Sequence, residues 1–300
     1  MPEFRAAQDE RKDKILGQLK LALDESSPAD KRASAVSSLS GIGFDFLLAN
    51  AEPLIKSKVA DVALATVQVL GGTIAMLPGE GHHSHAGGAQ ASDPNMEYQD
   101  GVVSRTMKLL RFALAHPDIT VREKAAGILS SRGDAQSLAA IQRMIDSGEL
   151  PAKKGIGLLT LAPTAVASPF IEKYLSATDT EVRAAAAAQL AYNPSYTSRV
   201  RTLALALNAD KMVVQAALPG LAVADKDFLQ YGVALSQNAQ LAPEVRSEAV
   251  KAVVSATINR KLDPETAGAI VPSLDETART TGSPDAAKAV QSLRRQYDLQ

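Results

Sequence analysis

The sequence predicts an all-α chain, folded as a right-handed stack of antiparallel helix pairs, that is, an α-solenoid. Similar stretches begin about every 30 residues, which is typical of repeat architectures. Apolar residues within each stretch recur at spacings of three and four, as on one face of a helix. The composition is 46% hydrophobic but only 4% aromatic, without tryptophan, and small side chains suit closely packed helices. We therefore expect about seven helix pairs, with a capping helix at each end.

Four stretches carry the clearest repeat start. They span residues 28–43, 117–133, 178–192 and 243–256. Each opens with Pro, Asp, Thr or Glu, and small apolar residues follow at helical spacing. Proline suits the first helical turn because its missing N–H costs nothing there, and Asp or Thr accepts hydrogen bonds from free first-turn N–H groups. Weaker copies begin near Lys58, Leu150 and Asp210.

A second helix is expected between each pair of first helices. Apolar spacing places these second helices at residues 44–55, 101–115, 135–146, 164–175, 196–207, 226–237 and 264–280. Helices at 5–23 and 284–297 should cap the two ends, because a terminal repeat needs a polar outer face. Pro169 and Pro219 fall inside expected helices, and each should kink or shorten its helix.

The Asp/Glu-x-Val-Arg start and the Ala-rich first helix resemble HEAT repeats of the short bacterial type, also called phycobilisome-lyase-like. The resemblance covers nearly all of residues 25–280. It implies the fold more than the function, because the family spans scaffolds, adaptors, lyase subunits and a few DNA-repair enzymes. It also implies that the arginine of the start meets an acidic residue of a neighbouring repeat. The matching positions are Arg32, Arg122, Arg183 and Arg246. Gln215 and Lys154 replace the arginine in weaker copies, so the series should be interrupted.

Residues 77–99 break the period and are rich in Gly, Pro, Ser and His. We expect a flexible inserted loop inside a single solenoid domain that spans residues 1–300. His82, His83 and His85 lie in this loop, and imidazoles so close together can chelate Ni, Cu or Zn. A functional metal site needs ligands held by surrounding groups, which a glycine-rich loop does not supply. We therefore interpret these histidines as adventitious metal ligands, with regulation or partner contact as the alternative.

Several function classes are disfavoured by composition. The 32 basic and 33 acidic residues leave a net charge of −1, whereas nucleic-acid binders usually carry a basic excess. Cysteine is absent, so neither a thiol nucleophile nor a disulfide is available. The sequence has no phosphate-binding GxxxxGK[ST] loop, no GxSxG motif and no apolar run long enough to span a membrane. His116 precedes Pro117 at an expected helix end, where a cation would meet the helix dipole favourably.

The second helices should line the concave face of the stack, and their outward residues should form its recognition surface. Arg and Tyr anchor protein interfaces more often than most residue types, so this mixed-charge surface favours a protein partner. The residues expected to contact the partner are Arg143, Lys173, Arg199 and Tyr231, among the wider outward set of Gln142, Asp146, Glu172, Thr202 and Gln230.

The sequence thus predicts a non-catalytic bacterial scaffold or adaptor that binds a protein and needs neither a cofactor nor a membrane. Two alternatives remain: a lyase or other enzyme subunit acting with a partner or bound cofactor, and a HEAT-like nucleic-acid-binding protein. A cytoplasmic location is expected. Residues 1–4 are typical of a cloning remnant, so an exported mature fragment is the alternative. The oligomeric state stays open.

Overall fold

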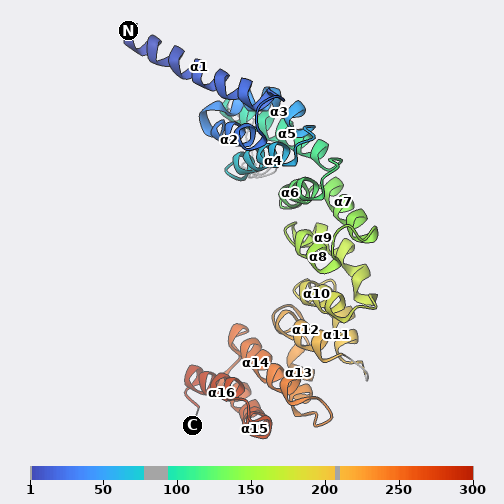
Figure 1. Cartoon of the computed structure of the whole chain (residues 1–300). Coiled ribbons are helices and arrows are strands. Elements are labelled where there is room, and N and C mark those ends of the chain that lie inside the picture. The colour runs from blue at the N-terminus through green and yellow to red at the C-terminus, as the bar shows by residue number, and fades with distance from the viewer. Residues whose placement is uncertain (1, 78–93, 207–209, 300) are drawn as a thin grey trace. The chain divides into compact units, whose positions relative to one another are not determined.

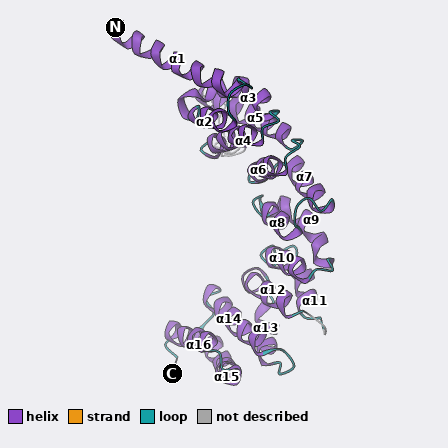
Figure 2. Cartoon of the chain, viewed as in Figure 1, coloured by secondary structure: helices purple, strands orange, loops and turns teal. Residues whose placement is uncertain are grey.

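The structure is a computed structural model that describes residues 2–77, 94–206 and 210–299. These residues form helices joined by short turns, and none of them lies in a strand (Figure 2). The all-α prediction is therefore confirmed for the described part of the chain.

Helices lie at most of the places along the described chain where the repeat pattern predicted them (Figure 1), and the count of seven pairs stays a prediction. The first helices of the pairs are α2 (Ala29–Ser38), α4 (Ala60–Ala75), α6 (Ile119–Ser130), α8 (Ala152–Leu159), α10 (Thr180–Leu190), α12 (Lys211–Ala224) and α14 (Pro243–Asn259). The second helices are α3 (Phe44–Ile55), α5 (Pro94–Ala113), α7 (Ala135–Asp146), α9 (Thr164–Glu172), α11 (Thr197–Ala204), α13 (Phe228–Gln237) and α15 (Pro264–Thr281). Two terminal helices, α1 (Pro2–Leu23) and α16 (Pro284–Tyr297), and two 3₁₀ turns, η1 (Gly41–Gly43) and η2 (Lys173–Ser176), complete the described elements.

Aspartates start three of the first helices. Asp118, Asp179 and Asp210 precede α6, α10 and α12, and each carboxylate accepts a hydrogen bond from the backbone N–H two residues later, at 2.7–2.9 Å. Hydrogen bonds from Thr120, through its side chain and its backbone N–H, hold the pKa of Asp118 below its ordinary value. The capping chemistry of the repeat starts is thus present in the structure.

Several predicted helix boundaries are wrong; among them, α1 begins at Pro2 rather than at residue 5, and α11 ends at Ala204, short of the predicted residue 207. Helix α5 begins at Pro94 rather than at residue 101, so residues 94–99, predicted to lie in the loop, are helical. Proline at a helix start is the signal for this earlier beginning. His82, His83 and His85 lie outside the described residues, and their metal binding stays a prediction. The expected helix 164–175 ends at Glu172 and continues as the 3₁₀ turn η2; Pro169, inside α9, provides no N–H for the helical hydrogen bond.

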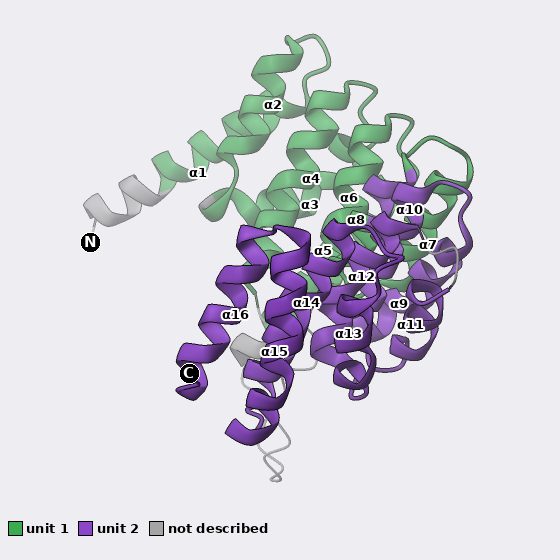
Figure 3. Cartoon of the chain, turned by 90° about the horizontal axis from the view of Figure 1, so that it is seen from below, with its two compact units in different colours: residues 1–151, 157–163 green, residues 152–156, 164–300 purple. Residues whose placement is uncertain are grey.

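The chain divides into two compact units, residues 1–151 with 157–163 and residues 152–156 with 164–300 (Figure 3). In unit 1, α2, α4 and α6 pack in succession, while α3 contacts both α1 and α5. In unit 2, α10, α12, α14 and α16 pack in succession, and α13 packs on α15. In each series a helix packs against the next-but-one helix of the chain, as expected when helix pairs stack on one another. The single domain over residues 1–300 stays a prediction.

Small residues let neighbouring first helices approach closely. Ala186 and Ala187 of α10 are fully buried. A Cβ atom at Gly220 of α12 would lie 2.5 Å from the Cβ atom of Ala191 and 2.8 Å from its carbonyl carbon. Because a side chain there would collide with backbone, α10 and α12 can pack this closely only around glycine. Small residues at this contact therefore have a direct packing role.

The expected arginine–acid contacts are confirmed at one of the four positions. Arg122 pairs with Glu149, before the next first helix. Arg183 instead donates to the backbone carbonyls of Ala177 and Thr178 at 2.7 and 2.8 Å. Carbonyl oxygens after a second helix lack intrahelical partners, and a guanidinium satisfies them. The remaining two arginines likewise donate to carbonyls near a helix end, Arg32 to Ala22 at 3.1 Å and Arg246 to Ser236 at 3.0 Å.

Candidate functional site

A groove in unit 2 runs between the α9–η2 segment and α11. Its volume is about 1310 Å³. Four residues from the outward set of the second helices line it: Glu172, Lys173, Arg199 and Thr202. The other lining residues are Pro169, Leu175, Ser176, Ser195, Tyr196, Ser198, Leu203 and Ala206.

The turn before α11 holds the two walls of the groove together. Asn193 donates from its amide to the Ser168 hydroxyl of α9 at 2.8 Å. The Asn193 side-chain oxygen accepts from the Ser195 backbone N–H at 3.1 Å. Ser168 is buried, and its hydroxyl donates to the Thr164 carbonyl at 2.7 Å. A hydrogen-bonded turn therefore connects α9 to the start of α11 at one end of the groove.

Charged side chains lie across the groove. Arg199 of α11 forms an ion pair with Glu172 of α9, yet the arginine side chain remains 63% exposed. Lys173 places its ammonium 5.1 Å from the ring centroid of Tyr174, a cation–π contact. The described lining therefore contains two basic residues and one acidic residue, and both basic side chains are exposed.

The groove also offers apolar surface. Leu175, Tyr196 and Leu203 are partly buried in its walls. The outward set of the second helices, defined by setting the apolar stripe aside, omitted Leu175 and Leu203. Their half-exposed positions at the ends of the second helices could not be separated from core positions by spacing alone. The described lining contains no histidine or cysteine, and its side chains combine charge with apolar surface.

The other two residues expected to contact a partner lie elsewhere. Arg143 is exposed on α7, in unit 1. Tyr231 lies on α13, and its hydroxyl donates to the Asp225 carboxylate at 2.9 Å. The structure thus brings together Lys173 and Arg199 but neither of the others, and partner contact at all four positions stays a prediction.

Tyr231 belongs to a polar cluster centred on Asp225, which is 3% exposed. Arg201 of α11 contacts the carboxylates of Asp225 at 3.3 Å and Asp227 at 3.2 Å. Burial, and then the hydrogen bond to Asp225, raise the pKa of Tyr231 well above its ordinary value. Its ring packs edge-on against Phe228 at 5.2 Å between centroids. These contacts tie three successive helices together, which is a structural role that sequence spacing does not indicate.

His116 is buried and hydrogen-bonded through both ring nitrogens. Nδ1 accepts from the Asp118 backbone N–H at 3.0 Å, so Nε2 carries the hydrogen and donates to the Ser57 carbonyl at 3.0 Å. The geometry fits a neutral imidazole rather than the cation that the sequence suggested. Among the described residues, no cluster of His, Cys, Asp and Glu could hold a metal ion.

No helix in the described residues combines the length and apolar character needed to cross a membrane. No family model matches the chain, and no curated protein matches it in sequence. Among solved structures, the complex of CpcE and CpcF of phycocyanin lyase from Nostoc sp. PCC7120 is 20% identical, covering 93% of this chain and 94% of that chain, with a TM-score of 0.30. An engineered protein is 18% identical, covering 95% and 96%, with a TM-score of 0.26. Similarities this weak carry no argument about fold or function.

Proposed function

We propose that the protein is a non-catalytic scaffold or adaptor that binds a protein partner in the groove between α9–η2 and α11. The observation that carries this proposal is the meeting of Lys173 and Arg199 with apolar surface in one groove of about 1310 Å³. The proposal includes a right-handed α-solenoid of about seven HEAT-like pairs. A bacterial origin, a cytoplasmic location and the absence of a cofactor remain part of the same expectation.

The lining chemistry favours a peptide segment that carries a carboxylate beside apolar side chains. The Arg199 side chain is 63% exposed while it pairs with Glu172, and a guanidinium has five N–H donors. Arg199 can therefore donate hydrogen bonds to a second carboxylate while it keeps its ion pair with Glu172. Leu175 and Leu203 would bury apolar side chains of the same segment, the arrangement in which interface anchors contribute most.

The experiment is affinity capture from a lysate of the source organism, with mass spectrometry. Three baits are compared: the wild type, the groove variant Lys173→Gln/Arg199→Gln, and the control variant Lys288→Gln/Arg295→Gln. The control removes one lysine and one arginine from exposed positions of α16, outside the groove. We expect one stoichiometric protein that the wild type and the control capture and the groove variant does not.

Equal capture by all three baits would contradict the proposal for this groove. A coloured or small-molecule-bearing preparation would favour the enzyme-subunit alternative. Affinity for DNA that falls steeply with salt would favour the nucleic-acid alternative.

A further inference from the structure

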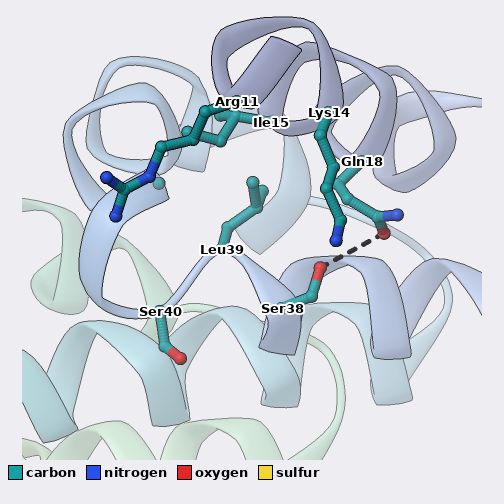
Figure 4. A pocket seen from close by; sticks show the side chains of 8 residues that line it. Arg11, Lys14, Ile15, Gln18, Ser38, Leu39 and Ser40 are labelled. Atoms are coloured by element: carbon teal, nitrogen blue, oxygen red, sulfur yellow. Dashed lines mark hydrogen bonds between the residues drawn. The ribbon is translucent and has the colours of Figure 1, made fainter. Parts of the chain in front are cut away.

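A second pocket lies in unit 1, between α1 and the C-terminal end of α2 (Figure 4). Its volume is about 270 Å³. Its lining residues are Arg11, Lys14, Ile15 and Gln18 from α1, with Ser38, Leu39, Ser40 and Gly43 opposite. Ligand pockets usually have volumes of about 300–1,000 Å³, so this one suits a small molecule or the end of a side chain.

The polar groups of the pocket come from one face of α1. Lys14 and Gln18 are four residues apart and so lie on the same side of the helix. Both extend toward Ser38, whose hydroxyl donates to the Gln18 side-chain oxygen at 3.2 Å (Figure 4). The Arg11 guanidinium lies on the other side of Leu39 (Figure 4). Donors thus flank the pocket on both sides.

The pocket is locally cationic in a chain whose net charge is −1. The described residues that line it include two basic residues and no acidic one. Arg11 and Lys14 are exposed, and no described ion pair uses either of them. Many other arginines, among them Arg122, are held by carboxylates or carbonyls. The pocket therefore presents positive charge that the described fold leaves available for a ligand.

The base of the pocket is apolar. Leu39 is buried, and Ile15 is partly buried beside it. A Cβ atom at Gly43 would lie 3.0 Å from a terminal methyl carbon of Leu39, so this position leaves little room for a side chain. A ligand that fills the pocket needs an apolar body over the two aliphatic side chains and an anionic group among several donors.

We propose that this pocket binds a phosphate monoester carried on a small apolar body. A phosphate monoester offers three acceptor oxygens and close to two negative charges at neutral pH. Lys14 would contact the phosphate, and the Ser38 hydroxyl, which donates to the Ala35 carbonyl at 2.7 Å, would turn its hydrogen to a phosphate oxygen. Arg11 would cover the apolar body from the other side of Leu39, since guanidinium groups stack on flat apolar surfaces.

The test uses phenyl phosphate as the probe, with binding to the full chain followed by isothermal calorimetry at low salt. The pocket variant is Arg11→Gln/Lys14→Gln. The matched control is Lys12→Gln/Lys20→Gln, which removes two charges from exposed positions of the same helix outside the pocket. We expect saturable binding that weakens about tenfold or more in the pocket variant and less than about threefold in the control.

Three further probes separate the contributions of the two halves of the ligand and identify its source. Phenol and inorganic phosphate should each bind more weakly than phenyl phosphate, because each lacks one half of the ligand. A phosphotyrosine peptide that binds and responds to the pocket variant assigns the site to phosphorylated side chains; binding of phenyl phosphate alone assigns it to free phosphate esters. No saturable binding of phenyl phosphate to the wild type, or equal weakening in both variants, would overturn the proposal.

Discussion

The groove between α9–η2 and α11 and the polar cluster around Asp225 both contain residues that the sequence offered as partner contacts. In the groove, Lys173 and Arg199 are exposed, and the side chain of Arg199 is 63% exposed while it forms an ion pair. In the cluster, Tyr231 is half-buried and bonded to a carboxylate that is 3% exposed. Outward spacing on a second helix therefore selects two kinds of residue, one exposed at the surface and one hydrogen-bonded within the fold.

The difference arises from the groups that lie within reach of each side chain. Arg201, in the same helix as Arg199, reaches Asp225 and Asp227 in the turn between α12 and α13. The carbonyl of Asp225 in turn accepts from Arg260, after α14, at 2.5 Å. Arg199 is two residues earlier and meets α9 at the open groove instead. The two groups of residues should therefore differ in their effects on stability and on binding.

The largest effect is expected for Asp225→Ala. The substitution leaves the Tyr231 hydroxyl and part of the Arg201 guanidinium without their acceptor in a buried place. We expect the free energy of unfolding to fall by about 2–4 kcal/mol, measured by urea denaturation. A loss below about 1 kcal/mol would show that the cluster contributes little to the fold.

A smaller loss of stability is expected for Asp134→Ala in unit 1. Asp134, like Asp225, is a buried carboxylate paired with an arginine. Asp134 accepts from Arg111 at 2.5 Å and caps α7 by accepting from the Ser137 backbone N–H at 2.8 Å. Because Arg111 is 40% exposed, water replaces much of what the arginine loses. We expect a loss of about 1–2 kcal/mol in the same urea experiment. A loss equal to that of Asp225→Ala would remove the distinction between the two clusters.

Alkaline pH should destabilise the protein through Tyr231. Its pKa in the folded state is raised by burial and by the bond to Asp225. Above the unfolded value of about 10 the unfolded state releases this proton and the folded state keeps it, so stability falls as pH rises. The expected slope is about 1.4 kcal/mol per pH unit for this group. Urea titrations between pH 9 and about pH 11 should show a steeper fall in the wild type than in Tyr231→Phe.

Tyr98 provides a contrast to Tyr231 in the same pH range. Its hydroxyl donates to Asp45 at 2.7 Å, and this hydrogen bond is the main cause of its raised pKa, but the residue is 59% exposed. We therefore expect Tyr98→Phe to change the alkaline slope less than Tyr231→Phe does. Equal changes in the two variants would contradict the assignment of the slope to burial.

The smallest effect on stability is expected in the groove. Lys173→Gln/Arg199→Gln should change the free energy of unfolding by no more than about 0.5 kcal/mol, because exposed ion pairs contribute little. Thermal unfolding followed by circular dichroism checks this. A loss above about 2 kcal/mol would place Arg199 with the structural residues instead.

The sequence predicted most of the helices because their ends carry strong local signals. The bounds of α3, α7 and α16 match the expected ranges, and the aspartate caps lie where the repeat starts placed them. Local signals also explain the error at α5, because Pro94 follows a long Gly- and Ser-rich stretch that obscured the helix start.

The site was only partly predictable, because its features depend on contacts between helices. Lys173 and Arg199 could be chosen from spacing, but the cluster of Arg201 with Asp225 joins residues 24 positions apart. Likewise, the pocket at Arg11 and Lys14 requires the turn after α2 to pack against α1. Such arrangements are set by packing geometry, which the apolar period of one helix does not determine.

The most direct measurement compares partner capture and melting temperature in two variants, Lys173→Gln/Arg199→Gln and Tyr231→Phe. We predict that the groove variant loses the captured protein while its melting temperature stays at the wild-type value. Tyr231→Phe should keep the captured protein and melt at a lower temperature. Undiminished capture by the groove variant, or loss of the partner in Tyr231→Phe with an unchanged melting temperature, would contradict the assignment of binding to the groove.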